Sequence, residues 1–203
     1  GHEAAYTNTT GHSNTAIGHR VFRLNTTGSR CVALGLGALD NNTTGDDNTA
    51  IGWQALDAVT TGLRNVAVGN NALTSQTSNY CTAIGFEAGE DCNASYNTFI
   101  GYQAGLNVTT GTQCVYIGSG AGNVATTGAQ NVFIGHNVQP NEGGDTIFIG
   151  AGNKTHTGDY SNNGFMGPGN SSGSYGGMYQ GNNSSTWSTT SDIRIKKNIV
   201  DND

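Results

Sequence analysis

The sequence predicts an all-β solenoid, and three observations support this fold class. A glycine recurs along the chain at short and nearly constant intervals, and repeats this short stack on one another because none can fold alone. An aliphatic residue or a methionine precedes each of these glycines, and residues 1–167 show no helical periodicity. We call the recurring residues the marker glycines; they are Gly18, Gly35, Gly52, Gly69, Gly85, Gly101, Gly118, Gly135, Gly150 and Gly167. They predict a parallel β-roll of ten rungs, with repeats of roughly 17 residues.

Each repeat is expected to carry one short strand that ends just before its marker glycine, which is counted as position zero. Position −3 is β-branched in nine of the ten repeats, which suits a strand. Positions −3 and −1 share one face of such a strand, and position −2 lies on the other. We predict that the aliphatic face formed by −3 and −1 points inward.

Position −2 changes character halfway along the chain. It is alanine in the first five repeats and aromatic in the last five, where it is Phe99, Tyr116, Phe133, Phe148 and Phe165. Five aromatic residues in register are a large apolar surface that must bury against something. We predict that they pack on a neighbouring subunit and that strand packing changes between Gly85 and Gly101, where the repeat is one position shorter than in the first turns.

A Thr-Thr-Gly turn lies seven positions before the marker glycine in six repeats. We expect its glycine to supply backbone angles that other residues resist. Ten rungs spaced about 4.8 Å apart would form a rod of roughly 50 Å. A coil this thin needs partners or capping ends to hide its faces.

Composition excludes several classes of function. Only 34% of the residues are hydrophobic and 11% are charged, which favours a thin core shared between rungs. The net charge is −6 and no basic patch could follow phosphates, so nucleic acid is not expected as a partner. No stretch of about 20 apolar residues occurs, so membrane insertion is not expected. The chain begins within a repeat, without an initiator Met or signal peptide, which indicates a piece of something longer.

The segment from Asn48 to Leu56, with the Thr-Thr-Gly turn, resembles the head repeats of trimeric autotransporter adhesins. It is still more similar to the longer variants found in phage tail-fibre proteins. The resemblance covers about residues 9–167 and implies a homotrimer of parallel β-rolls. The implied role is a structural fibre segment of the virion tail that presents, or lies beside, a surface for a host glycan or protein. A bacterial surface adhesin head is the alternative, and an ice-binding solenoid is a third.

The segment from Ser191 to Ile199 resembles the start of the endosialidase-type intramolecular chaperone, which helps tail spikes and fibres trimerise and then cuts itself off. The resemblance implies Ser191 as nucleophile, Lys196 as base and the Thr190–Ser191 bond as the cleaved bond. A lysine base must lose its proton, which burial promotes. The alternative is an amphipathic, charged stem. The sequence stops at Asp203, whereas the chaperone needs a whole domain, so we expect no catalysis from this chain and do not classify it as an enzyme.

These resemblances divide the chain into three parts: a repeat head or shaft at 1–167, a neck at 168–190 and the start of the chaperone domain at 191–203. The neck is rich in Gly, Ser, Asn and Tyr, and we predict that three chains wrap together there. The alternative is a flexible linker.

Few other side chains suggest chemistry. Trp53, Phe86 and Tyr102 directly follow marker glycines and could stack on sugar rings, although packing between rungs or subunits also explains them. Cys31, Cys81 and Cys114 occupy position −4, where other repeats have Asn. Rungs two or three apart are too distant for a disulfide, so free thiols are predicted, with cross-subunit bridges as the alternative. The acidic pairs Asp46–Asp47 and Glu90–Asp91 are interpreted as solvated residues of turns and not as a catalytic carboxylate pair. No metal site or cofactor is predicted, although one residue could supply three ligands on a three-fold axis.

Overall fold

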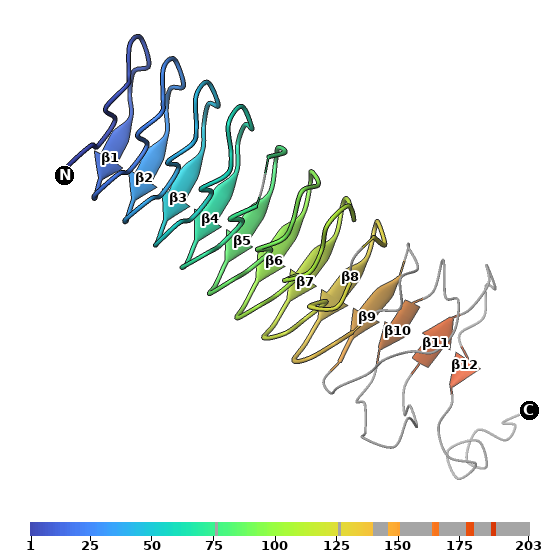
Figure 1. Cartoon of the computed structure of the whole chain (residues 1–203). Coiled ribbons are helices and arrows are strands. Elements are labelled where there is room, and N and C mark those ends of the chain that lie inside the picture. The colour runs from blue at the N-terminus through green and yellow to red at the C-terminus, as the bar shows by residue number, and fades with distance from the viewer. Residues whose placement is uncertain are drawn as a thin grey trace, which may run out of the picture.

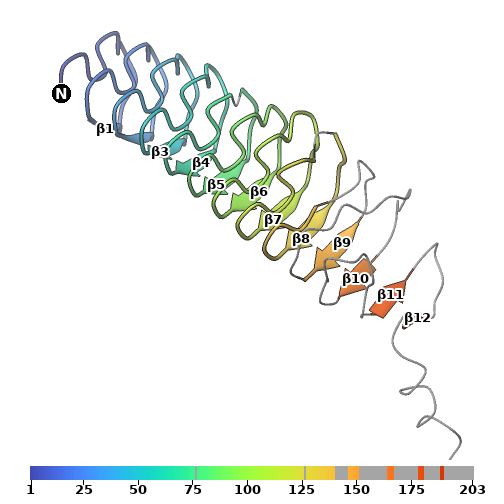
Figure 2. The same ribbon diagram turned by 60° about the horizontal axis from the view of Figure 1, so that its bottom comes forward.

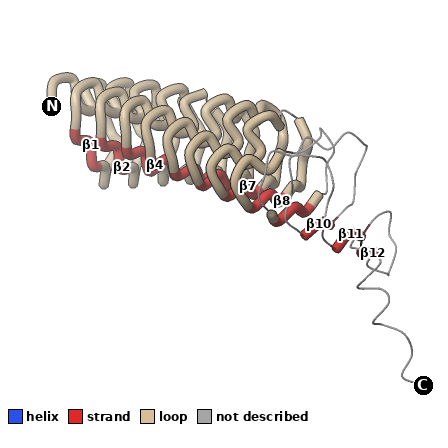
Figure 3. The backbone as a smooth tube through the Cα atoms, turned by 90° about the horizontal axis from the view of Figure 1, so that it is seen from below, coloured by secondary structure: helices blue, strands red, loops and turns tan. Residues whose placement is uncertain are grey.

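The computed structural model describes residues 1–75, 77–125, 127–139 and 146–150, together with the backbone of residues 164–166, 178–180 and 188–189. Within these residues the chain is all-β, without a helix, and winds as a parallel β-solenoid (Figure 1). The loops of successive turns run side by side (Figure 2). The strands lie along one side of the coil and the loops form the rest (Figure 3). The predicted fold class is therefore confirmed.

The strands follow the repeat, because each solenoid strand has three residues and ends just before a marker glycine. Their bounds are β1 Thr15–Ile17, β2 Val32–Leu34, β3 Thr49–Ile51, β4 Val66–Val68, β5 Thr82–Ile84, β6 Thr98–Ile100, β7 Val115–Ile117, β8 Val132–Ile134, β9 Ile147–Ile149 and β10 Gly164–Met166. Neighbouring strands pair equivalent residues of successive repeats, such as Ala16 with Ala33. Strands β11 (Met178–Gln180) and β12 (Ser188–Thr189) extend the sheet in antiparallel pairing.

The number of turns differs from the predicted ten rungs. From β1 to β8 the chain makes about seven turns, interrupted in the description only at residues 76 and 126. β9 and β10 keep the parallel register, but most of the chain that would close their turns lies outside the described residues. The same holds for the predicted neck at 168–190, apart from the backbone of β11 and β12, and for all of 191–203. A marker glycine identifies a strand end, and it does not by itself establish a closed turn.

The prediction of which strand face points inward is wrong. Position −2 is the buried one: Ala33 and Ala50 at the start of the coil, and Phe99 further along, have no exposed surface. Positions −3 and −1 lie on the outer face, where Ile17 and Leu34 are 58% and 40% exposed. Phe99, Tyr116, Phe133 and Phe148 therefore fill the inside of the coil and do not pack on a neighbouring subunit; the side chain of Phe165 lies outside the described residues. A turn this narrow has room for only one inward side chain from each strand.

The size of the side chain at −2 is matched by the residue at +4. Three successive alanine turns carry leucine at +4, as in Ala50 with Leu56, and all of these side chains are buried. The first two aromatic turns carry glycine instead, as in Tyr116 with Gly122. A Cβ added to Gly122 would lie 2.5 Å from Cδ2 of the Tyr116 ring. Large and small residues thus exchange places across the coil while the space between them stays filled.

The marker glycines are required because they stack on one another. Gly101 has a φ of 132°, and a Cβ added to it would lie 2.6 Å from the carbonyl carbon and oxygen of Gly118 in the next turn. Equivalent contacts recur from Gly18 to Gly135. Any side chain at this position would therefore push successive turns apart.

The glycine of the Thr-Thr-Gly turn is required for space and not, as predicted, for its backbone angles. Gly28 has no positive φ, but a Cβ on it would lie 2.5 Å from Asn25 Oδ1 and 2.6 Å from the carbonyl oxygen of Gly45. Positive φ instead occurs at many described non-glycine residues, including Gln54 and Leu56. This conformation costs roughly 1–2 kcal/mol per residue. The hydrogen bonds between turns must offset that cost.

Asparagine and cysteine share one buried position, as predicted from their common place at −4. Asn48 accepts a hydrogen bond from the backbone of Asn65 in the next turn at 2.9 Å and donates to the carbonyl of Gly62 at 2.7 Å. Cys31 lies at the same position one turn earlier, and its thiol donates to the carbonyl of Gly45 at 3.4 Å. Both side chains thus tie the strand to the turn beside it, and the thiol does so through a weaker bond.

Candidate functional site

The three aromatic residues predicted as a ligand-binding surface lie in one column along the outside of the coil. Trp53, Phe86 and Tyr102 are 46%, 43% and 53% exposed. The rings of Phe86 and Tyr102 stack with their centroids 5.6 Å apart. Trp53 stands two turns before Phe86, with Asn70 between them in the column. The structure therefore brings two of the three together and leaves Trp53 separate.

Near Trp53 the first turns enclose a polar cavity that sequence reasoning missed. The cavity has a volume of about 240 Å³, and Arg20, Arg23, Asp40 and Asp57 are among the residues that line it. Position +5 holds Arg23, Asp40 and Asp57 in three successive turns. The spacing of one repeat between these charges was the available signal, because residues one repeat apart are neighbours in a solenoid.

The charges in this cavity are paired unequally. Arg23 binds Asp40 through two hydrogen bonds of 2.8 and 3.1 Å, and Arg20 adds a third of 3.3 Å. The hydrogen bond to Asp40 raises the pKa of Arg23. Asp57 makes no ion pair with any described residue, and its side chain receives only a long hydrogen bond of 3.4 Å from Asn41. Burial, and then the charge of Asp40, raise the pKa of Asp57.

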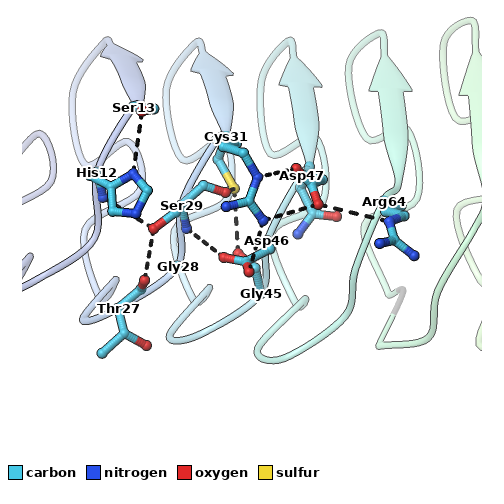
Figure 4. A network of polar contacts seen from close by, with 12 residues as sticks. His12, Ser13, Thr27, Gly28, Ser29, Cys31, Gly45, Asp46, Asp47 and Arg64 are labelled. Atoms are coloured by element: carbon cyan, nitrogen blue, oxygen red, sulfur yellow. Dashed lines mark hydrogen bonds and ion pairs between the residues drawn. The ribbon is translucent and has the colours of Figure 1, made fainter.

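A second group of polar residues, which we call the ridge, joins successive turns of the coil (Figure 4). Arg30 donates to Asp47 at 2.6 Å and to Asp46 at 3.1 Å, and Arg64 lies 3.8 Å from Asp47. The hydrogen bond from Arg30 lowers the pKa of Asp47. The acidic pair at Asp46–Asp47 is therefore held by arginine as well as by the turn. Both carboxylates are committed to ion pairs, so this site suits surface cohesion better than acid–base chemistry.

The ridge continues as a row of aromatic rings. The Arg64 guanidinium lies 5.6 Å from the Tyr80 ring centroid, which is a cation–π distance. Tyr80 in turn stacks on Tyr96 with the centroids 5.0 Å apart. These contacts join successive turns, and they use ring faces that a ligand would otherwise need.

All four cysteines are buried, and none of them forms a disulfide within the chain, as predicted. Burial raises the pKa of Cys31 to about 11, which keeps its thiol protonated and unreactive near neutral pH. The sequence did not predict that Cys92 lies beside Cys81. Cys81 and Cys92 both donate to the carbonyl of Ala94, at 3.0 and 3.4 Å.

The remaining predicted site residues give no site in the part of the chain that the structure describes. Ser191 and Lys196 lie outside the described residues. No group of three or more His, Cys, Asp or Glu side chains able to hold a metal ion occurs among the described residues. In the same part of the chain, no helix is long and apolar enough to cross a membrane.

Two surfaces therefore remain as candidates for function: the outer face of the sheet and the polar cavity beside the Trp53 column. The sheet face offers apolar contact along the coil. The cavity offers an unpaired carboxylate, arginine donors and a concave shape. No family model, curated protein or solved structure matches the chain.

Proposed function

We propose that the chain is a structural segment of a homotrimeric fibre in a phage tail, and that it presents or adjoins a receptor-binding surface. The repeat resemblance supports the trimer and the tail. The single structural observation that carries the proposal is the outer face of the sheet, because it is the surface that most needs a partner.

This face is long and free of charge. In β1 to β9, every residue at positions −3 and −1 is Thr, Val, Leu or Ile. Several of these side chains are well exposed: Ile17 is 58% exposed, Ile147 48% and Ile84 42%. A long, uncharged and largely apolar surface of this kind marks an interaction site in soluble proteins. Three copies that turn these faces toward a common axis would cover them.

Measurement of molar mass in solution tests the proposal directly. Light scattering after size exclusion is expected to give about three times the chain mass of 20.9 kDa. The double variant Ile51→Glu/Ile100→Glu places charges in the middle of the face and is expected to give monomers with an unchanged circular dichroism spectrum. The matched control is Thr61→Glu/Thr110→Glu, which adds the same charges at exposed positions in the Thr-Thr-Gly turns, outside the strands, and should remain trimeric. A monomeric wild-type chain would refute the trimer.

A bacterial surface adhesin head would have the same repeat and the same exposed face. The neighbours of the parent gene separate the two roles: tail-assembly genes favour the fibre, and a secretion anchor favours the adhesin. An ice-binding role would instead produce thermal hysteresis, which a fibre segment would not.

Self-cleavage at the Thr190–Ser191 bond is a second part of the proposal, and it rests on the resemblance at Ser191 to Ile199. In the product of the full parental gene, Ser191→Ala should abolish processing while Ser188→Ala leaves it intact. Persistent cleavage in Ser191→Ala would show that Ser191 is not the nucleophile.

A further inference from the structure

We propose that the polar cavity lined by Arg20, Asp57 and Leu36 binds one pyranose ring of a surface carbohydrate. This inference deepens the receptor-binding part of the proposed fibre role and rests on it. The cavity lies on the first turns of the coil, where three successive turns each contribute a charged residue at position +5.

The size of the cavity favours a small ligand. Its volume of about 240 Å³ is below the roughly 300–1,000 Å³ of pockets that enclose drug-sized molecules. A single sugar ring is an appropriate occupant, with the rest of a glycan extending into solvent.

The charges in the cavity favour a neutral, hydroxyl-rich ligand. Two arginines and two aspartates line it, so neither an anion nor a cation meets a field of one sign. Asp40 is committed to Arg23 and Arg20, whereas the half-buried Asp57 forms no ion pair with any described residue and only feels the charges of Arg20 and Arg23 from further away. The Asp57 carboxylate can therefore accept hydrogen bonds from two neighbouring hydroxyl groups, and such bonds to a charged acceptor are strong.

Donors and an apolar surface complete the site. Arg20 is bound to Asp40 through one Nη–H, and guanidinium has five N–H groups in all, so donors remain for ring or hydroxyl oxygens. The amides of Asn41 and Gln54 also line the cavity. Leu36 is 48% exposed at its edge, and Trp53 occupies the same column one turn further on. These two side chains can cover the C–H face of a pyranose.

The arrangement is specific to these turns. Position +5 is Thr74 in the next turn and Glu90 in the one after it. Glu90 has a raised pKa, first through burial and then through Glu87 and Asp91, but no arginine occurs between Arg64 and Arg194. Glu90 is therefore a matched control: a carboxylate in the same column that does not line this cavity.

The test measures binding of methyl pyranosides to the whole chain by saturation-transfer NMR and calorimetry, with glucoside, mannoside, galactoside and N-acetylglucosaminide as probes. At least one is expected to bind. Asp57→Asn should weaken that binding at least tenfold and Leu36→Ala severalfold, whereas Glu90→Gln should leave it unchanged. Circular dichroism confirms that each variant folds.

Two outcomes would overturn the site: no pyranoside binds at millimolar concentration, or Asp57→Asn and Glu90→Gln bind as wild type does. Molar mass measured on the same samples separates this result from the fibre proposal. A trimer that binds no pyranoside overturns the cavity proposal alone. A monomer that binds one, with the loss in Asp57→Asn, supports the cavity and refutes the fibre.

Discussion

The exchange of large and small residues across the coil predicts a strong energetic coupling between Phe99 and Gly89. Gly89, at +4 of the preceding turn, has a φ of 60°, and a Cβ added to it would lie 2.7 Å from Cε2 of the Phe99 ring. Leu56 occupies the equivalent position in an alanine turn with a φ of 53°. The backbone at this position therefore accepts leucine when the opposing residue is alanine.

The two single variants should each be destabilised. Phe99→Ala removes a fully buried ring and should cost about 3–5 kcal/mol. Gly89→Leu should cost about 1–3 kcal/mol for overpacking and a further ~1–2 kcal/mol for its left-handed backbone. In the double variant the overlap disappears and the leucine fills part of the space that the ring leaves. We expect its free energy of unfolding to exceed the additive value by at least about 2 kcal/mol.

Urea unfolding gives the free energies, and hydrogen exchange of β5 to β7 shows whether the change is local, with β2 as an internal reference. The control pairs Gly89→Leu with Phe133→Ala, which removes the same type of ring two turns from Phe99 and should be additive within about 0.5 kcal/mol. Additivity within that limit for Phe99→Ala/Gly89→Leu would refute the proposed packing exchange.

Three further predictions concern single positions. Gly52 has a φ of 138° and its added Cβ would point at the carbonyl of Gly69, so Gly52→Ala should lower the free energy of unfolding by about 3 kcal/mol or more. Gly37 has only an ordinary contact near an added Cβ, so Gly37→Ala should lower it by ~1–2 kcal/mol. Equal losses of stability in urea unfolding would contradict the stacking of marker glycines. Tyr116→Phe removes a buried hydroxyl that lies near Cys114 and Asn131 without a well-formed hydrogen bond to any described residue, so stability should rise by about 1 kcal/mol, and a loss of that size would show that the hydroxyl is bound. Cys31→Asn should add about 0.5–1.5 kcal/mol at pH 8 by completing the asparagine row. Burial raises the pKa of Cys31 from 9.0 to about 11. The stability that the protonated Cys31 thiol contributes is therefore complete below pH 9 and falls as the pH approaches 11, and the Asn variant lacks this pH dependence. An equal loss of stability between pH 9 and 11 in both proteins would refute this reasoning.

The repeat period was enough to predict the strands. Every solenoid strand lies at positions −3 to −1, because a short period forces equivalent residues into register. The shared position of Asn48 and Cys31 followed from the same alignment. Register does not determine which face of a strand is inside, however. The more aliphatic face, at −3 and −1, suggests a core from sequence alone, whereas the narrow coil encloses position −2.

The polar cavity was missed for a related reason. Arg23, Asp40 and Asp57 are ordinary surface charges when each is considered within its own repeat. Their meaning comes from stacking, which places residues one repeat apart in contact. A comparison of the residues at the same repeat position in successive turns would have predicted the contact between Arg23 and Asp40. The unpaired state of Asp57 depends on side-chain geometry that the column alone does not specify.

The exchange between positions −2 and +4 also limits how such a coil can change its length through gene duplication. The ring of Phe99 contacts the space over both Gly89 and Gly105, so the turn that precedes the first aromatic turn must already carry glycine at +4. The turn of Ala83 and Gly89 meets this need and acts as an adapter between two incompatible kinds of turn. Duplication or loss of a whole turn within either kind preserves the fit. Recombination that joins an alanine–leucine turn directly to an aromatic turn places leucine against the ring, so the order of turns is constrained even where their number is free.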